Sequence, residues 1–458
     1  MRLSLLCTIV LLTLAGSSHA GAQRVFTADE HARILAFWAA PNRYECAVPE
    51  RNGLEPWQVR LTPEGSAWLL RFQQTGGGGK APPTADPLAQ AVAVTWKEWV
   101  QRRMAYDRWL AQRTADRLNA ADLRAFLVLS GQAKAELASK TANHAMMPEP
   151  ANPGMIPPDL LAAVGNPPAF AEAVIPLQHK VTFDEGDVYT YQDHTNVRPT
   201  YAYYRFPQGV ATGGSPLTDA ERTSLFDAAG LTDSEKRVMM AISKLEGSFD
   251  AVNTYDTGYV SIGFIQFITF DDGRHSLAQV LNHEKTDAPA DFERDFRRFG
   301  IDLNADHVLT VVDTSTGAEL TGTDAVHKVI DDKRLIAVFQ KAGKTSTPFR
   351  IAQIRVAKEA YWPADEPICV TVNGRSLSCK LSDIIKSEAG MAAFFDRKVN
   401  RGNVLPLPDV VMQTMLRHNI TQLSDVSKYE KEIVAACKYR VDFLSDSALT
   451  QPDPIPQQ

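Results

Sequence analysis

The chain has 458 residues, of which 44% are hydrophobic and 22% are charged, with 27 Gly and 27 Pro. This composition is typical of a folded soluble protein, and it excludes a fully disordered chain, a collagen and a bundle of membrane helices. Lys and Arg total 48 against 54 Asp and Glu, a formal net charge of -6. Nucleic acid is therefore not an expected partner, and binding to an anionic surface would have to be local.

The first 22 residues have the pattern of a secretory signal peptide. Arg2 gives a positive start, Leu3 to Ala15 form an apolar run, and Ser18-His19-Ala20 is a small-x-small cleavage site. The apolar run is too short to anchor the chain across a bilayer, and a buried core helix is the alternative. We expect export to a periplasm or out of the cell, with no transmembrane anchor.

Residues 23–75 show no clear period, and residues 76–86 form a Gly-rich flexible linker. The helical region 87–150 follows. Its first predicted helix runs from Pro87, with Asp86 as N-cap, to about Asn119, and a second runs from Asp122 to Lys140. Apolar residues, three tryptophans among them, recur at helical spacing in the first helix, which favours a packed core over a ligand-stacking surface.

Residues 160–215 are a tyrosine-rich β segment, with expected strands at 188–191 and 201–206. The main domain, 216–446, is mostly helical with a hairpin near 308–320, and the Pro/Gln-rich tail 447–458 is expected to be disordered. The predicted fold class is mainly α with small β elements, an α+β protein. The sequence assigns no role to residues 23–215.

Four cysteines follow the signal peptide, an even number for an oxidising destination. Cys369 and Cys379 flank Asn373-Gly374, which is a strong signal for a two-residue hairpin turn. We predict a disulfide between these two cysteines, with two unpaired thiols as the alternative. Cys46 and Cys437 could form another pair, but the spacing does not determine the connectivity.

The chemistry is concentrated between Leu231 and Gly273. Thr232 and Glu235 form a capping box, which predicts the start of a helix whose apolar stripe leads to Glu246 at its C-terminal end. Apolar neighbours and the negative end of the helix dipole would both raise the pKa of this carboxyl. Glu246 is therefore a candidate general acid.

Asp256 follows ten residues later in a polar turn, before an alternating run from Tyr259 to Phe267 that predicts a strand or hairpin arm. One carboxyl in apolar surroundings and one in polar surroundings is what cleavage of a glycosidic bond requires. Ser261 could hold the attacking water. Spacing alone favours an exposed Glu at the helix end and a turn Asp over a catalytic pair.

The segment resembles the catalytic core of the lysozyme-like superfamily, which includes phage and goose-type lysozymes, lytic transglycosylases and chitosanases. The resemblance rests on Glu246, on Asp256-Thr257-Gly258-Tyr259-Val260-Ser261-Ile262-Gly263 and on Gly263-Phe264-Ile265-Gln266. It is best over 232–273 and looser over 217–403. It implies a helix that ends with the acid Glu246 and leads into a β-hairpin carrying Asp256 and Ser261, with Gln266 lining the cleft.

The resemblance also implies hydrolysis of β-1,4 linkages in an amino-sugar polymer, with peptidoglycan expected and chitosan as the alternative. Asp256 favours hydrolysis over a lytic transglycosylase reaction, because transglycosylases work without a second carboxylate. Three aromatic residues are candidate sugar contacts, although packing would explain them equally well: Tyr255, Tyr259 and Phe267. Residues 396–402 could form the far wall of the cleft, or be ordinary helix and turn.

No pattern in the chain implies a metal or an organic cofactor. The His283-Glu284 pair lacks the second histidine of a zinc-protease helix, and Asp271-Asp272-Gly273 lacks the spaced oxygens of a calcium loop. A non-catalytic protein that binds a glycan or a partner on a lysozyme-like fold is the rival hypothesis. It expects Glu246 to be exposed or ion-paired, with no groove between Glu246 and Asp256, whereas the hydrolase hypothesis expects a long groove with Glu246 partly buried.

Overall fold

The computed structural model describes residues 24–49, 55–75, 87–130 and 148–456. Helices make up about 49% and strands about 14%, which confirms a mixed α+β protein. The predicted signal peptide and the Gly-rich linker lie outside the described residues. Within them, no helix is both long and apolar enough to cross a bilayer.

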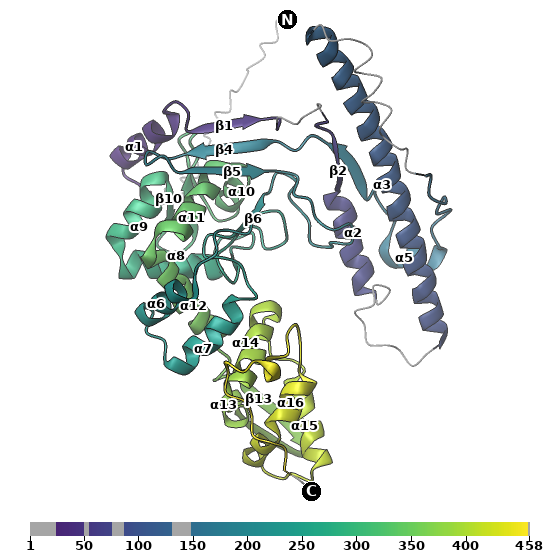
Figure 1. Cartoon of the computed structure of the whole chain (residues 1–458), viewed down its shortest axis with the longest axis vertical. Coiled ribbons are helices and arrows are strands. Elements are labelled where there is room, and N and C mark those ends of the chain that lie inside the picture. The colour runs from purple at the N-terminus through teal and green to yellow at the C-terminus, as the bar shows by residue number, and fades with distance from the viewer. Residues whose placement is uncertain (1–23, 50–54, 76–86, 131–147, 457–458) are drawn as a thin grey trace, which may run out of the picture.

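The largest part of the molecule is a helical body with three small sheets (Figure 1). Its elements are α1 (Ala28–Ala39), β1 (Tyr44–Ala47), β4 (Gln178–Thr182), β5 (Val188–Gln192), β6 (Ala211–Thr212), α6 (Asp219–Ala228), α7 (Asp233–Ser243), β7 (Val252–Asn253), β8 (Ser261–Ile262), β9 (Phe267–Ile268), α8 (Ser276–Asp287), α9 (Pro289–Asp295), η1 (Arg297–Phe299), β10 (Ile301–Leu303), β11 (Leu309–Val312), β12 (Glu319–Thr321), α10 (Thr323–Asp331), α11 (Lys333–Thr345) and α12 (Thr347–Tyr361). The sheets have the antiparallel orders β1-β4-β5, β6-β7-β8-β9 and β10-β11-β12.

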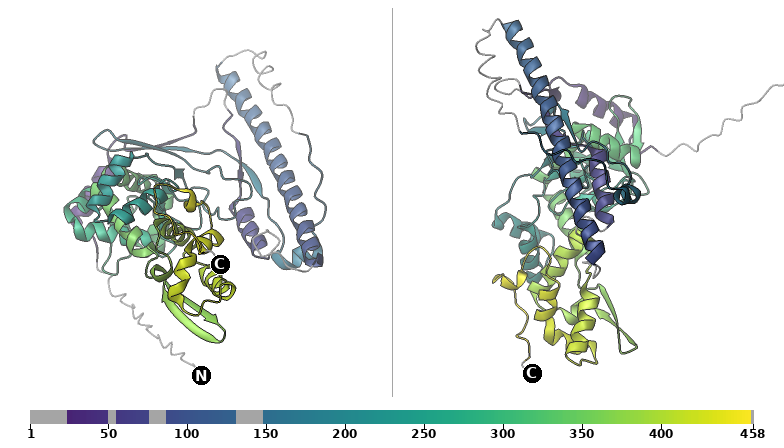
Figure 2. Two further views of the ribbon diagram at one scale, coloured as in Figure 1. Left: turned by 60° about the horizontal axis from the view of Figure 1, so that its bottom comes forward. Right: turned by 90° about the vertical axis from the view of Figure 1, so that its right-hand side faces the viewer.

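A second part, which we call the appendage, stands beside the body (Figures 1 and 2). It contains β2 (Gln58–Leu61), α2 (Pro63–Gln74), α3 (Pro87–Ser130), α5 (Pro158–Val164) and β3 (Ala171–Val174). These elements fall between β1 and β4, which are themselves paired, so the appendage is inserted between two neighbouring strands of the body. Its small core is centred on Trp68, Trp99 and Phe170.

The C-terminal region continues the core of the body and carries a hairpin, β13 (Pro367–Val372) with β14 (Arg375–Lys380). Its helices are α13 (Leu381–Ile384), α14 (Glu388–Arg401), α15 (Leu407–Arg417), η2 (Leu423–Tyr429), α16 (Glu430–Ala436) and η3 (Phe443–Ser445). Helix α14 packs against α7, and this contact brings the C-terminal region to the segment that follows α7.

The cysteine hairpin forms with the predicted turn, but the predicted disulfide is wrong. Cys369 lies opposite Ser378, and Cys379 lies opposite Ile368, so the two cysteines are one residue out of register. Successive side chains on a strand point to opposite faces, so the two thiols lie on different faces of the hairpin. All four cysteines in the described part of the chain are free.

Three other predicted elements differ from the structure. Residues 87–130 form one continuous helix, α3, with no break at 120–121, and the rest of the second predicted helix lies outside the described residues. Residues 201–206 form a loop with a single bridge from Tyr204 to Asp256 instead of a strand. The tail expected to be disordered is packed where it begins. Leu449 is buried, and Thr450 exchanges backbone and hydroxyl hydrogen bonds with Glu388 at the start of α14, whose free N–H groups need acceptors.

One buried carboxyl in the body keeps its proton when the chain folds. Glu284 on α8 is 1% exposed, and its Oε1 accepts from Ser346 Oγ at 3.4 Å. Burial and the neighbouring Asp295 raise the pKa of Glu284 to about 9. The folded protein therefore holds this proton at neutral pH, whereas the unfolded chain releases it near the ordinary glutamate pKa of 4.5.

This proton makes stability fall as the pH rises. Between about pH 4.5 and 9 the folded state holds one proton more than the unfolded state, so this group lowers the unfolding free energy by about 1.4 kcal/mol per pH unit. Glu284→Gln keeps the neutral form and should flatten that slope. Urea unfolding of both proteins at pH 6 and pH 8 measures the difference, and equal slopes would contradict the prediction.

Candidate functional site

The candidate site lies on the β6-β7-β8-β9 sheet, in the segment that follows α7. Thr232 caps α7 as predicted, but the helix ends at Ser243, so Glu246 lies in a turn beyond it instead of in its last turn. The neighbouring Gly247 lies close to the β8–β9 turn: a Cβ built on it would be 3.7 Å from the carbonyl oxygen of Gly263 and 3.9 Å from Gln266 Nε2. Glu246 and Gln266 therefore belong to the same end of this sheet.

The Glu246 carboxyl is largely buried and faces α14. Its side chain is 11% exposed, and Oε1 accepts hydrogen bonds from Arg440 Nη2 and from Asn400 Nδ2, the latter at 3.4 Å. Burial raises the pKa of Glu246, the nearby Asp396 raises it further, and Arg440 opposes both effects without cancelling them. Burial, more than a helix dipole, therefore favours the protonated acid.

Arg440 forms ion pairs with two carboxyls, those of Glu246 and Asp396. Its Nε lies 3.0 Å from Asp396 Oδ1, and Asp396 is 1% exposed on α14. Asn400 donates to Asp396 Oδ1 at 3.3 Å as well as to Glu246. One cation between two buried carboxyls leaves one excess negative charge, and a proton on Glu246 removes it.

Arg440 is a site residue that the sequence did not predict. Residues 396–402 were a candidate far wall of the cleft, and Asp396 and Asn400 do face Glu246 from that helix. Arg440 follows almost two hundred residues after Glu246, in a turn after α16 that carries no periodic or spacing signal. Only the packing of α14 against α7 brings it to the site.

Asp256 lies at the other end of the same strands. Its Oδ2 accepts from Tyr201 Oη at 3.0 Å and from Asn253 Nδ2 at 2.8 Å, and its Oδ1 accepts from the Gly258 amide at 2.9 Å. Three donors thus occupy a carboxyl group whose two oxygens together have about four acceptor positions. Glu246 precedes β7 and Asp256 follows it, so the two carboxyls belong to opposite ends of the paired strands β7 and β8.

The loop 201–206 covers Asp256 from the side of the appendage. The amides of Arg205 and Phe206 both donate to the carbonyl oxygen of Tyr255, at 2.8 and 3.1 Å. The ring of Tyr255 packs against those of Tyr201 and Tyr204, with centroids 5.8 and 6.1 Å apart. Asp256 is therefore held by a contact between the body and the appendage.

The remaining predicted site residues have different surroundings. Phe267 is 1% exposed in the core of the body, so the predicted sugar contact at Phe267 is wrong, whereas Tyr255 is partly buried against the appendage and its sugar contact stays a prediction. Ser261 is buried beneath Gly258, on which a Cβ would come 2.7 Å from Ser261 Oγ. Tyr259 is half-buried with a positive φ of 62°; it lines an open pocket, and its ring packs against Phe206 and His327.

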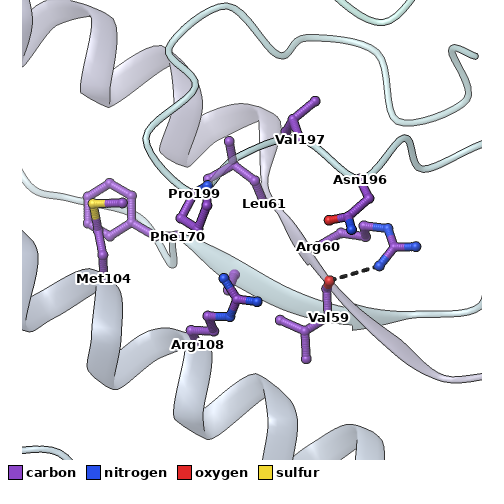
Figure 3. Close-up of a pocket in the computed structure, with 10 residues that line it drawn as sticks. Val59, Arg60, Leu61, Met104, Arg108, Phe170, Asn196, Val197 and Pro199 are labelled. Atoms are coloured by element: carbon purple, nitrogen blue, oxygen red, sulfur yellow. Dashed lines mark hydrogen bonds between the residues drawn. The ribbon is translucent and has the colours of Figure 1, made fainter. Parts of the chain in front are cut away.

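A separate small pocket lies in the appendage, between α3, strands β2 and β3, and residues 196–199 (Figure 3). Met104, Leu61 and Phe170 supply apolar surface, and Arg108 and Asn196 lie beside it (Figure 3). Its volume of about 30 Å³ is enough for one or two water molecules and too small for a sugar ring. This pocket is not a candidate for polymer binding.

The arrangement can donate a proton from Glu246 and can present a fixed negative charge at Asp256. No group of three or more His, Cys, Asp or Glu side chains in the described ranges is placed to hold a metal ion. A scan against protein-family models, a search of curated proteins and a search of solved structures each returned no match.

The shared cation predicts opposite effects for two carboxyl-to-amide changes. Glu246→Gln fixes this side chain in a neutral form and leaves Arg440 bonded to Asp396, so the unfolding free energy at pH 7 should stay equal or rise by about 0.5–1 kcal/mol. Asp396→Asn removes the fully buried partner and should lower it by about 1.5–3 kcal/mol. Urea unfolding of the two variants decides, and a large loss in Glu246→Gln would show that the ion pair is structural.

Proposed function

We propose that the chain is an exported glycoside hydrolase that cleaves β-1,4 linkages of an amino-sugar polymer by general acid/base catalysis, with peptidoglycan as the expected polymer, as in the muramidases that it resembles. The observation that carries the proposal is the contrast between a buried Glu246 with a raised pKa and a polar, hydrogen-bonded Asp256 on one short sheet. The resemblance of residues 232–273 to the lysozyme-like superfamily supports the same pair.

In this proposal Glu246 gives its proton to the oxygen of the leaving sugar. Protonated Glu246 leaves Arg440 neutralised by Asp396, so the site carries no excess charge before reaction. When Glu246 loses its proton, Arg440 is already in hydrogen-bonding position to stabilise the new carboxylate. Asn400 donates to the same oxygen and orients it.

Asp256 would activate the attacking water or stabilise positive charge on the sugar ring. A separation of the two carboxyls of roughly 6.5–9.5 Å would indicate inversion, with a water between them, and one of about 5–5.5 Å would indicate retention. Gln266 at the Glu246 end would position substrate, and the buried Ser261 would act through the loop that holds Asp256. Chitosan is the alternative substrate, because an acidic chain suits a cationic polymer.

A second candidate function is non-catalytic glycan or partner binding. The observation that favours it is the ion pair of Glu246 with Arg440, together with the occupation of Asp256 by three donors. In this case Glu246 and Asp256 would be structural residues, each holding together the segments to which its carboxyl is bonded. The two candidates differ in whether polymer is cleaved.

Reducing-end release from purified peptidoglycan and from chitosan tests the hydrolase. Glu246→Gln should lower release by about 10²–10⁴-fold, since it removes the general acid. Asp409→Asn, an exposed carboxyl on α15, is the matched control and should keep full activity. Release that survives in Glu246→Gln would refute the mechanism, and absence of release from both polymers by folded wild-type protein would favour the binding function.

The pH profile is a further test of the acid. Because the pKa of Glu246 is raised, the proton stays available above the usual range of a glutamate, and the rate should decline as the pH rises through that pKa. Arg440→Gln removes the group that lowers this pKa, so the declining limb should move to higher pH. A limb that does not move in Arg440→Gln would exclude Glu246 as its origin.

A further inference from the structure

Two open pockets adjoin each other at the Asp256 end of the sheet, and both are lined by Arg274. The first has a volume of about 370 Å³ and lies around Tyr259 and Phe270. The second has a volume of about 440 Å³ and extends to His283 and His307. The amide of Leu309 donates to the carbonyl oxygen of Gly273 at 3.1 Å. This hydrogen bond holds the loop that carries Arg274 beside the loop that carries His307. We call the two pockets together the Arg274 groove.

The aromatic end of the groove is held in a costly backbone conformation. Phe270 is 43% exposed with a positive φ of 48°, and it is the only phenylalanine among the exposed large apolar side chains of the described residues. Tyr259 also has a positive φ, and its ring lies 4.9 Å from that of Phe206. Bulky residues rarely adopt this conformation, and the strain persists where it serves a function. The His275 and Phe270 rings make a T-shaped contact with centroids 4.7 Å apart, and the exposed part of the Phe270 side chain is the surface available for stacking.

Some polar groups of the groove are free to bind, whereas His283 and Glu359 are bonded to each other, with Nε2 and Oε2 2.9 Å apart. The guanidinium of Arg274 has no hydrogen bond or ion pair with any residue of the described ranges, and Gln279 and His307 are exposed. Three carboxylates line the groove against one arginine: Asp271, Asp272 and Glu359. An aromatic face flanked by planar polar side chains suits a sugar chain, which has apolar ring faces and many hydroxyls. The carboxylate excess suits amino groups on that chain.

We infer that the Arg274 groove is a glycan-binding site for an oligosaccharide of β-linked 2-amino-2-deoxyglucose units, held outside the position of bond cleavage. The inference rests on the proposed function, because it takes the polymer class from it. The groove begins next to Asp256, whose carbonyl oxygen accepts from the Tyr259 amide at 3.0 Å. Glu246 lies at the opposite end of the strands, so the groove would hold sugars beyond the scissile bond. The acetylated and the deacetylated chain share this chemistry.

The test measures binding without cleavage. The full chain carrying Glu246→Gln is titrated calorimetrically with the hexamer of N-acetylglucosamine and with the hexamer of glucosamine. Adding Phe270→Ala should weaken binding of the preferred hexamer about tenfold, because it removes the stacking face. Adding Arg274→Ala should weaken the acetylated hexamer and strengthen the cationic one, because it removes a donor and a positive charge. Unchanged affinities in both variants would overturn the proposal.

Matched controls separate binding from folding. Leu416→Ala removes an apolar side chain that is 50% exposed on α15, and Arg375→Ala removes an exposed arginine in the β13–β14 hairpin. Neither should alter affinity. Phe270→Gly and Phe270→Ala both remove the ring, but glycine relieves the positive φ. Phe270→Gly should therefore melt at a higher temperature than Phe270→Ala and bind the hexamer as weakly. Strong binding by either variant would contradict the groove proposal.

The wild-type cleavage assay, run in parallel, separates the two proposals. If polymer is cleaved but the affinities do not depend on Phe270 and Arg274, the hydrolase proposal would be supported and the groove proposal overturned. Binding that depends on these two residues without cleavage would support the groove and the binding function. If the protein neither cleaved polymer nor bound either hexamer, both proposals would be overturned.

Discussion

The sharing of Arg440 between Glu246 and Asp396 is the interaction on which the candidate site depends. It joins the turn after α7, the helix α14 and the segment after α16, which are distant in the sequence. Two carboxyls and one cation in a largely buried place cannot all be charged without an excess of negative charge. A proton on Glu246 removes the excess negative charge. Burial also favours this protonated form, because it raises the pKa of Glu246. The same arrangement that makes Glu246 expensive when ionised makes it suitable as an acid.

The appendage is connected to this chemistry through Asp256. It is inserted between β1 and β4, and the loop 201–206 links its core to the loop that carries Asp256. Tyr201 donates to the carboxylate, and Tyr204 is buried in the appendage core three residues later. A movement of the appendage would therefore change the hydrogen bonds of Asp256, because the two share one short and well-packed loop.

Residues with a left-handed backbone conformation flank the short strands of the site. Tyr259, Gln266 and Phe270 all have positive φ within twelve residues, although none of them is glycine. Gln266 lies at the Glu246 end, and the two aromatic residues lie at the end where the Arg274 groove begins. Such conformations cost free energy and need the packing of neighbouring residues to maintain them. Here the buried core of α8 and the β10-β11-β12 sheet provides that support.

The sequence by itself determined the local features, whose signals lie within a few residues. The Thr232 capping box, the Asn373-Gly374 turn, the mixed α+β class and the candidates Glu246 and Asp256 all follow from short patterns. The tertiary structure alone decided which side chains meet them: Arg440 at Glu246, Tyr201 at Asp256, and the burial of Phe267. It also decided the strand register that places Cys369 and Cys379 on opposite faces. These outcomes depend on packing between distant segments, and a one-residue shift or a buried neighbour leaves no mark on local composition.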